Sequence, residues 1–321
     1  MAIRFIDLFS DNPNSLDRKN EIRDFLKTDT VEIKSPTKTY RLVDYIASGT
    51  YGDVFISDNL AIKISDTQGE NLREAYANIL LSDKCKYIVK LYEAFTYKFD
   101  SYIYLVQVYE LMDGTIAHQL LDYNSICNLL IFLLRTVECL HQNGFAHMDI
   151  KSENILYKGN CFKLGDLGLV CSENDKTGII ANTNITIMKC RYLTMYVPGK
   201  YKNIKDLQEL SFEDAQALDL WAIGVVIYRK TMPKYGLDAR TSLKLGNTTM
   251  DKLPSLDPRF TLKAGEKIPI HLSKPPTSGP IPVKVFENVL SMLLDDGKFT
   301  LAKDILKYLE EHVDLGKFKN C

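Results

Sequence analysis

Four polar side chains that lie close together in the sequence have the chemistry of a catalytic site. The carboxylate of Asp149 can accept a proton from an incoming hydroxyl and orient it. Lys151 follows two residues later, and because alternate side chains of an extended loop point the same way, its ammonium shares a face with Asp149. Asn154 and Asp166 carry the hard oxygen ligands that Mg²⁺ prefers. This set suits phosphoryl transfer, which requires positioning and charge neutralisation more than covalent chemistry.

The apolar pattern on either side predicts the elements that position these residues. A leucine-rich run at 129–141 predicts a helix that ends at Asn143-Gly144, a C-cap signal. The runs at 154–157 and 161–164, separated by Lys-Gly-Asn, predict two short strands. We expect the two aspartates to lie at opposite ends of this hairpin.

The order His147-x-Asp149-x-Lys151-x-x-Asn154, followed by Asp166-x-Gly, resembles the catalytic loop and metal-binding motif of eukaryotic-type protein kinases. The resemblance implies an α+β fold with a small β-rich N-lobe, which carries one key helix, and a larger, mainly helical C-lobe. It implies ATP and Mg²⁺ as cofactors and a protein as substrate. By the same resemblance Asp149 and Lys151 are catalytic, and Asn154 and Asp166 hold the metal.

The resemblance also predicts the domain organisation. Residues 1–38 form an N-terminal extension, 39–111 the N-lobe and 112–321 the C-lobe, with an irregular Pro-rich insertion at about 247–283. Residues 15–26 can form a helix in the extension. Either that helix packs on the outside of the fold, or the extension is a regulatory or partner-docking arm.

The residues expected to bind the nucleotide lie in the N-lobe. Glycines in the turn at 47–54 let backbone amides approach phosphate oxygens, although alanine stands at the first glycine position of the family. Lys63 lies in an apolar strand, where an ammonium needs a partner or an anionic ligand. By resemblance it contacts the α- and β-phosphates and a helix glutamate. The expected cofactor-binding residues are Ala47, Gly49, Gly52, Val54, Ala61, Lys63, Glu74, Tyr109, Glu110 and Met112.

The partner glutamate should lie on a helix at 70–82. We favour Glu74, because an apolar packing face follows it, and keep Glu70 as the alternative. Strands are predicted at 88–91 and 102–109, and the segment 92–101 joins them.

The segment from Glu110 to Gly114 resembles the linker between the lobes, whose backbone would hydrogen-bond the adenine edge. Tyr109 would lie at the back of that pocket; the alternative is a plain core aromatic residue. If Tyr109 limits the pocket, Tyr109→Gly should admit bulky adenine analogues.

Several positions depart from the family pattern. Met148 replaces an arginine that reads an activation-loop phosphate, so we expect activity without that phosphorylation. Gly199 and Phe299 stand where a buried glutamate–arginine pair is usual and look like a joint replacement. The segment 166–198 is polar and expected to be mobile. By contrast, the Asp-x-Trp-x-x-Gly helix beginning at Asp219 matches the family.

The composition excludes several classes of protein. The chain has 321 residues and a net charge of -1, which gives no sign of a nucleic-acid-binding surface. No apolar run predicts a membrane span, and the charged N-terminus does not resemble a signal peptide. The 7 cysteines are scattered, which favours reduced thiols in an intracellular protein of the cytoplasm or nucleus.

A lysine two residues after the catalytic aspartate, here Lys151, resembles the serine/threonine branch of the family. Two other functions are alternatives to a serine/threonine kinase. A pseudokinase scaffold is favoured by Ala47 and opposed by the intact Lys63 and Asp149. A small-molecule kinase of the aminoglycoside or choline type is opposed by Lys151 and by the helix at Asp219. The eroded positions also resemble kinases of large DNA viruses or intracellular pathogens. The sequence does not identify a regulatory partner.

Overall fold

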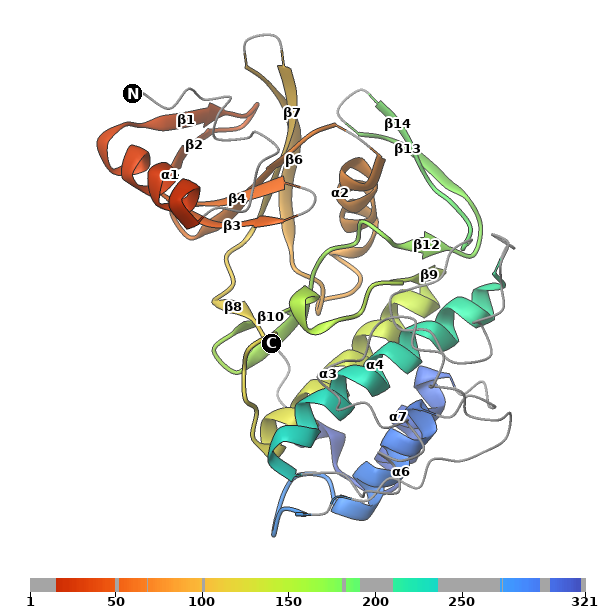
Figure 1. The fold of residues 1–321 in the computed structure, drawn as a ribbon. Coiled ribbons are helices and arrows are strands. Elements are labelled where there is room, and N and C mark those ends of the chain that lie inside the picture. Colours follow the sequence, from red (N-terminus) through yellow and green to blue (C-terminus); the bar gives the residue numbers. More distant parts are fainter. Residues whose placement is uncertain are drawn as a thin grey trace. The chain divides into compact units, whose positions relative to one another are not determined.

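The computed structural model describes residues 16–49, 52–67, 69–99, 102–180, 183–190, 210–235, 272, 274–294 and 301–318. Contacts divide these residues into two units (Figure 1). Unit 1 contains the described residues up to Asp113, with 167–169 and 177–187, and unit 2 contains the remainder. We expected a boundary after residue 111. Each unit is described by itself.

Unit 1 is built on one antiparallel sheet with the strand order β3-β4-β5-β7-β6. Its helices are α1 (Leu16–Thr28) and α2 (Gly69–Leu81). Its strands are β1 (Val31–Lys34), β2 (Thr39–Leu42), β3 (Asp44–Gly49), β4 (Gly52–Ser57), β5 (Leu60–Ser65), β6 (Leu91–Phe99), β7 (Tyr102–Glu110), β13 (Lys176–Ile180) and β14 (Thr183–Ile187).

One face of this sheet is covered by the N-terminal part of the chain. Phe55, Ile62 and Val108 are directly paired across β4, β5 and β7, so their side chains share a face. They form a buried cluster with Ile22 and Leu26 of α1. The predicted N-terminal helix therefore packs on the sheet and contributes to the core of unit 1.

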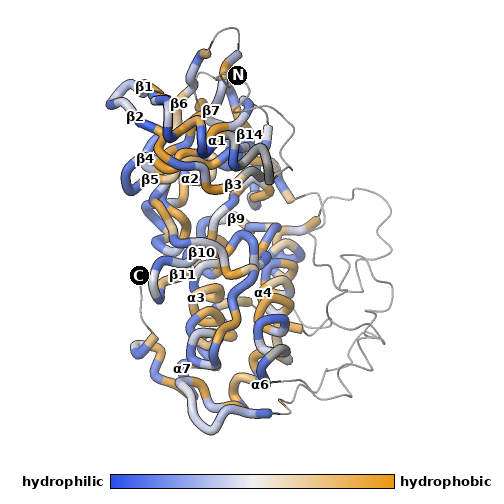
Figure 2. The backbone as a smooth tube through the Cα atoms, turned by 60° about the vertical axis from the view of Figure 1, so that its left-hand side comes forward, coloured by the Kyte–Doolittle hydropathy of each residue, from blue (hydrophilic) through white to orange (hydrophobic). Residues whose placement is uncertain are grey.

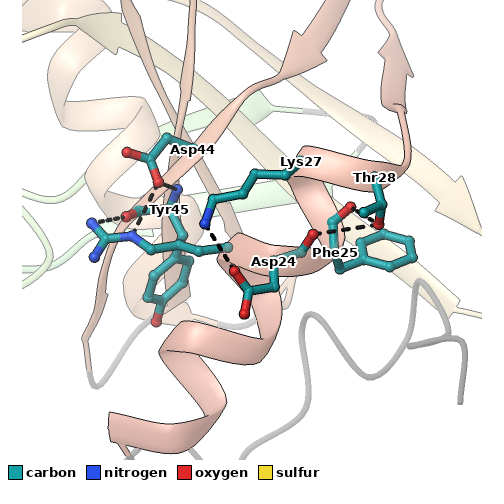
Figure 3. A network of polar contacts seen from close by, with 7 residues as sticks. Asp24, Phe25, Lys27, Thr28, Asp44 and Tyr45 are labelled. Atoms are coloured by element: carbon teal, nitrogen blue, oxygen red, sulfur yellow. Dashed lines mark hydrogen bonds and ion pairs between the residues drawn. The ribbon is translucent and has the colours of Figure 1, made fainter.

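Polar contacts fix α1 on the first sheet strand (Figure 3). The guanidinium of Arg23 donates to the Asp44 carboxylate at 3.1 Å and to the carbonyl of Tyr45 at 3.0 Å. Strands β1 and β2 pair as an antiparallel hairpin, and residues 35–38 form its turn.

The prediction for the region around β6 was wrong. We expected a strand at 88–91 and a connection at 92–101, but β6 extends over Leu91–Phe99 and pairs with β7 along its length. The strand lies at the edge of the sheet and carries exposed polar residues such as Thr96 and Lys98. Charged, half-exposed edge strands resemble loops in sequence.

Unit 2 is mainly helical. Its helices are α3 (Tyr123–Gln142), α4 (Phe212–Tyr235), α6 (Val283–Leu293) and α7 (Ala302–Glu310), with short 3₁₀ turns η2 (Ser152–Asn154) and η5 (Leu315–Lys317). Its strands are β8 (Gly114–Thr115), β9 (Phe145–Ala146), β10 (Ile155–Lys158), β11 (Cys161–Leu164) and β12 (Cys171–Ser172). The predicted helix at 129–141 is therefore present as part of α3.

Helix α3 forms the centre of unit 2. Asp122 caps its start by accepting from the backbone N–H of Ser125 at 2.8 Å. It ends at Asn143, and Gly144 follows with a φ of 75° that favours glycine. Among the described residues only α3 is long and apolar enough to span a membrane; Figure 2 colours the residues of this helix by hydropathy. However, 67% of that window is buried, as in the core helix of a globular domain.

The β10–β11 hairpin determines where the two aspartates of the motif lie. Ile155 pairs with Leu164, and the N–H of Gly165 donates to the carbonyl of Asn154 at 2.9 Å. The chain therefore enters and leaves the hairpin at its open end. Our expectation that Asp149 and Asp166 flank opposite ends was wrong, since an antiparallel pair returns the chain to its starting edge.

Some predictions lie outside the described residues. They concern the joint replacement at Gly199 and Phe299 and residues 1–15. Most of the Pro-rich insertion at 247–283 also lies outside; its described part, 272 and 274–282, has no helix or strand before α6 begins.

Candidate active site

The predicted catalytic loop of unit 2 converges on the carboxylate of Asp149. The ammonium of Lys151 donates to its Oδ2 at 2.7 Å, and the Asn154 side-chain nitrogen donates to the same oxygen at 2.8 Å. Asn154 also donates to the backbone carbonyl of Asp149 at 2.9 Å. Asp149 is only 7% exposed, so these contacts hold a buried carboxylate in one orientation.

The ammonium of Lys151 remains charged in this site. Burial would lower the pKa of Lys151, but the hydrogen bond to Asp149 and the charges of Asp149, Asp166 and Glu153 outweigh it, so the pKa is raised. A permanent cation next to Asp149 can neutralise an anionic group that approaches it.

A buried carboxylate on α4 fixes the backbone of this loop. Asp219 accepts from the backbone N–H groups of His147 at 2.8 Å and Met148 at 2.9 Å, and it lies 3.0 Å from Nε2 of His141. Met148 has a φ of 66°, a left-handed conformation that is strained for a long side chain. Asp219 thus stabilises the strained backbone at Met148, the residue directly before Asp149, and so fixes where Asp149 lies.

His147 connects the loop to the hairpin end that carries Asp166. The N–H of Asp149 donates to Nδ1 of His147 at 3.2 Å, so this ring nitrogen accepts. The Nε2–H is therefore the proton that meets the carbonyl of Gly165 at 3.1 Å. Asp166 follows directly with a φ of 58°. One fully buried imidazole links the two motifs of unit 2.

The predicted metal ligands, Asn154 and Asp166, suit Mg²⁺. The side-chain nitrogen of Asn154 is engaged by Asp149, so its amide oxygen is the atom that remains for a cation. Mg²⁺ usually takes one or two protein ligands and completes its shell with phosphate oxygens and water.

Met148 lies in an apolar cluster next to a disulfide. Its side chain is fully buried and packs with Leu218, Cys171 and Cys190, and the two cysteines are bonded to each other. The expectation of reduced thiols was therefore wrong for this pair, and Cys85 and Cys139 are disulfide-bonded as well. The 19-residue separation of Cys171 and Cys190 gave no signal in the sequence. The disulfide joins the segment after Asp166 to a point beyond β14.

Unit 1 carries the predicted lysine–glutamate pair. The ammonium of Lys63 on β5 donates to Oε2 of Glu74 on α2. Both side chains are largely buried, at 15% and 6% exposure, so the pair is shielded from solvent. The structure thus pairs Lys63 with Glu74, and not with the alternative, Glu70.

The sheet register groups the expected nucleotide-binding residues. Ala47 pairs with Val54, Val54 with Lys63, and Ala61 with Tyr109, so these side chains share the face opposite to the α1 cluster. Gly49 pairs with Gly52 at the end of the hairpin. Gly52 has a φ of 141°, and a Cβ there would lie 2.5 Å from the carbonyl oxygen of Ile64, so only glycine fits.

The expected adenine-contacting segment follows β7. Glu110, the last residue of β7, donates its backbone N–H to the carbonyl of Lys90 at 3.0 Å, and its side-chain Oε1 accepts from the N–H of Lys90 at 2.7 Å. Met112 lies beyond the strand and is half-buried. Tyr109 is buried, and its hydroxyl donates to Oε1 of Glu74 at 3.1 Å. Tyr109 is thus more than a plain core aromatic residue.

Helix α2 is also held by the segment that follows Asp166. Ile180 of β13 and Ile185 of β14 pack against Leu72 of α2. The guanidinium of Arg73 donates to the carbonyl of Gly168 at 2.9 Å. We expected this segment to be polar and mobile, whereas its described part folds as a β-hairpin on the helix that carries Glu74.

Two residues that hold the loop were missed in the sequence. Asp219 was assigned only to the fold, and His147 was given no role. The spacing of the two motifs was a signal for both residues, but their partners lie 72 and 18 residues away.

Comparison with known proteins gives a consistent result. Residues 40–269 match the protein kinase domain family. Calcium/calmodulin-dependent protein kinase type 1 of Caenorhabditis briggsae is 27% identical over 221 residues, 62% of this chain and 57% of that protein. A probable serine/threonine-protein kinase of Encephalitozoon cuniculi is 26% identical over 228 residues, 68% of this chain and 40% of that protein.

A third relative, the serine/threonine-protein kinase TOS3 of Saccharomyces cerevisiae, is 23% identical over 277 residues, 76% of this chain and 49% of that protein. The chain thus spans about half the length of the curated relatives it matches. The family match covers well over half of the chain and includes the Lys63–Glu74 pair and the Asp149 loop. The chain belongs to the protein kinase domain family, as a divergent member with an α+β fold.

Proposed function

We propose that this chain transfers the γ-phosphate of Mg·ATP to serine and threonine hydroxyls of protein substrates. The observation that carries the proposal is the buried Asp149 carboxylate, oriented by Lys151 and Asn154. Both contacts are made to Oδ2, so Oδ1 is the oxygen that would accept the proton of the substrate hydroxyl. The names of the similar proteins support serine and threonine as acceptors.

The other residues have roles that follow from their contacts. Lys63, held by Glu74, would bind the α- and β-phosphates, and Lys151 would neutralise charge on the γ-phosphate. Asn154 and Asp166 would hold Mg²⁺, which neutralises the charge that develops on the phosphate oxygens. The ATP, the metal and the protein substrate are parts of this proposal.

We also propose that activity does not depend on activation-loop phosphorylation. Met148 supplies no guanidinium and is buried in an apolar cluster. A phosphate near the loop would therefore lack a bidentate partner from this position. Phosphatase-treated protein should keep its activity; inactivity that is reversed by loop phosphorylation would contradict this.

The test is transfer of labelled phosphate from Mg·ATP to casein and a peptide library, with amino-alcohols as competing acceptors. Wild type should label the proteins, and Asp149→Asn should lower the rate by about 10²–10⁴-fold without loss of fold. Labelling of amino-alcohols alone would favour a small-molecule kinase. Binding of ATP without any transfer would favour a pseudokinase scaffold.

A further inference from the structure

A chain of buried hydrogen bonds lies behind the Lys63–Glu74 pair in unit 1. The side-chain nitrogen of Gln107 donates to the hydroxyl of Tyr109 at 2.7 Å, and that hydroxyl donates to Oε1 of Glu74 at 3.1 Å. Lys63 contacts the other carboxylate oxygen, Oε2. Gln107 is fully buried, and Tyr109 and Glu74 are 8% and 5% exposed. Glu74 is therefore held through both of its oxygens.

The direction of this chain is fixed by its acceptor end. An ionised carboxylate accepts hydrogen bonds and cannot donate, so the single hydroxyl proton of Tyr109 has to point at Glu74. The hydroxyl oxygen can then only accept, which requires the nitrogen of Gln107 on that side. A flipped amide would draw the hydroxyl proton to Gln107 and leave Oε1 of Glu74 without its donor.

The orientation of the Gln107 amide lowers the stability of the fold. Its amide oxygen is buried and has no hydrogen-bond partner within the described part of the chain. A buried acceptor without a partner is destabilising, and an apolar side chain would avoid the loss. A glutamine is useful here only because its nitrogen supplies a donor to Tyr109.

We propose that Gln107 and Tyr109 are positioning residues that orient the Glu74 carboxylate towards Lys63. The inference rests on the proposed function, in which Lys63 binds the nucleotide phosphates. Lys63 and Gln107 are directly paired on β5 and β7. Two adjacent strands therefore contact the Glu74 carboxylate, β5 through Lys63 and β7 through Tyr109. Both carboxylate oxygens have their donors only when α2 is oriented so that Glu74 points at these two side chains.

In this chain of hydrogen bonds Tyr109 has two roles. Its ring would border the adenine pocket, while its hydroxyl orients Glu74. Substitution by glycine would enlarge the pocket and break the hydrogen-bond chain at once. We therefore expect Tyr109→Gly to accept bulky adenine analogues with a lower rate than its pocket size alone would give.

The test compares Tyr109→Phe and Gln107→Met with a matched control. Tyr109→Phe should lower kcat/KM for ATP by about 10-fold, since a hydrogen bond to a charged group is lost, and Gln107→Met by about fivefold. The control is Tyr40→Phe, which removes the hydroxyl of another buried tyrosine; that hydroxyl donates to Glu93 at 2.6 Å and not to Glu74. It should leave kcat/KM within about twofold. Equal losses in Tyr109→Phe and Tyr40→Phe would overturn the proposal.

A double-mutant cycle separates positioning from packing. In the Glu74→Ala background, Tyr109→Phe should cause no further loss, because the hydroxyl then has no carboxylate to orient. A full additional 10-fold loss in that background would show that the hydroxyl acts independently of Glu74, and the proposal would fail.

Hydrogen exchange keeps the inference testable when transfer or ATP binding is absent. Amides of α2, residues 69–81, should exchange about fivefold faster in Tyr109→Phe and Gln107→Met than in Tyr40→Phe, without nucleotide. This result with an inactive wild type would sustain the hydrogen-bond chain and reject the proposed function. If the α2 amides exchange at the wild-type rate in all three variants, the proposed role of the hydrogen-bond chain is rejected, whether or not the protein transfers phosphate.

Discussion

The two units hold their functional residues in opposite ways. In unit 1, Lys63, Glu74 and Tyr109 come from a strand, a helix and a second strand, and side-chain contacts between these regular elements set their positions. In unit 2, Asp149 and Lys151 belong to one continuous loop. Regular elements place side chains by packing, whereas a loop needs its backbone fixed.

The loop of unit 2 is fixed by few, strong constraints. A single carboxylate, Asp219, accepts from two successive backbone amides, and Met148 adopts a left-handed conformation between His147 and Asp149. Unit 1 spreads the same task over a sheet, a helix and a hairpin that packs on it. Single substitutions should therefore do most damage in unit 2.

The largest effect is expected for Asp219→Ala. The change removes the acceptor of two buried amides and of His141, so the free energy of unfolding should fall by about 4 kcal/mol. Urea unfolding measures this. Glu213→Ala, an exposed carboxylate on the same helix, is the control and should change stability by less than about 0.5 kcal/mol. Equal stability of the two variants would contradict the role of Asp219.

The disulfide of unit 2 should give the next effect. Cys171 and Cys190 close a loop of 19 residues, which predicts a loss of about 3 kcal/mol in Cys171→Ala with Cys190→Ala. Reductant should destabilise wild type by about 3 kcal/mol more than the double variant, because the variant lacks this bond while Cys85 and Cys139 are disulfide-bonded in both proteins. Cys161→Ala, at a free thiol, is the control. Wild type that unfolds at the same urea concentration with and without reductant would show that the bond does not form.

In unit 1, loss of the lysine partner should change the kinetics with ATP. Glu74→Ala should lower kcat/KM for ATP by about 100-fold, because Lys63 is no longer oriented. Glu70→Ala, on the same helix, should stay within about twofold of wild type. The comparison of initial rates separates the two glutamates. Equal losses would mean that the helix as a whole, and not the pair with Lys63, is needed.

The smallest effect is expected at the helix cap of unit 2. Asp122→Ala should lower the free energy of unfolding by about 1 kcal/mol. The backbone N–H of Ser125 holds the pKa of Asp122 below its ordinary value of 3.8. The contribution is therefore complete above that value and is lost as pH falls through the lower folded pKa. Urea unfolding at pH 7 and about pH 2 should show the difference between wild type and variant shrinking with acid.

The sequence predicted best where the chemistry is contiguous. The loop from His147 to Asn154 carries its residue types at fixed spacing, and the neighbouring helices have clear apolar faces, so both were predictable. Glu74 was chosen over Glu70 from the position of the packing face alone. These are local signals, set by residues within a few turns of one another.

Contacts between distant segments were not predictable. The hydrogen bond from Tyr109 to Glu74 spans 35 residues, and the amide contacts of Asp219 span 72 and 71. Strand β6 was missed because an exposed edge strand lacks an apolar run. The hairpin β13–β14 was missed because its segment is largely polar, and the isoleucines that pack with Leu72 of α2 come one from each strand, Ile180 and Ile185.

The measurement that tests the account most directly is ATP affinity and phosphate transfer in the same preparation of Asp149→Asn. In the proposed function, Lys63 of unit 1 binds the nucleotide and Asp149 of unit 2 carries out the transfer. The variant should bind Mg·ATP within about threefold of wild type and transfer phosphate about 10²–10⁴-fold more slowly. Transfer at the wild-type rate, or loss of ATP binding in a folded variant, would contradict this division between the two units.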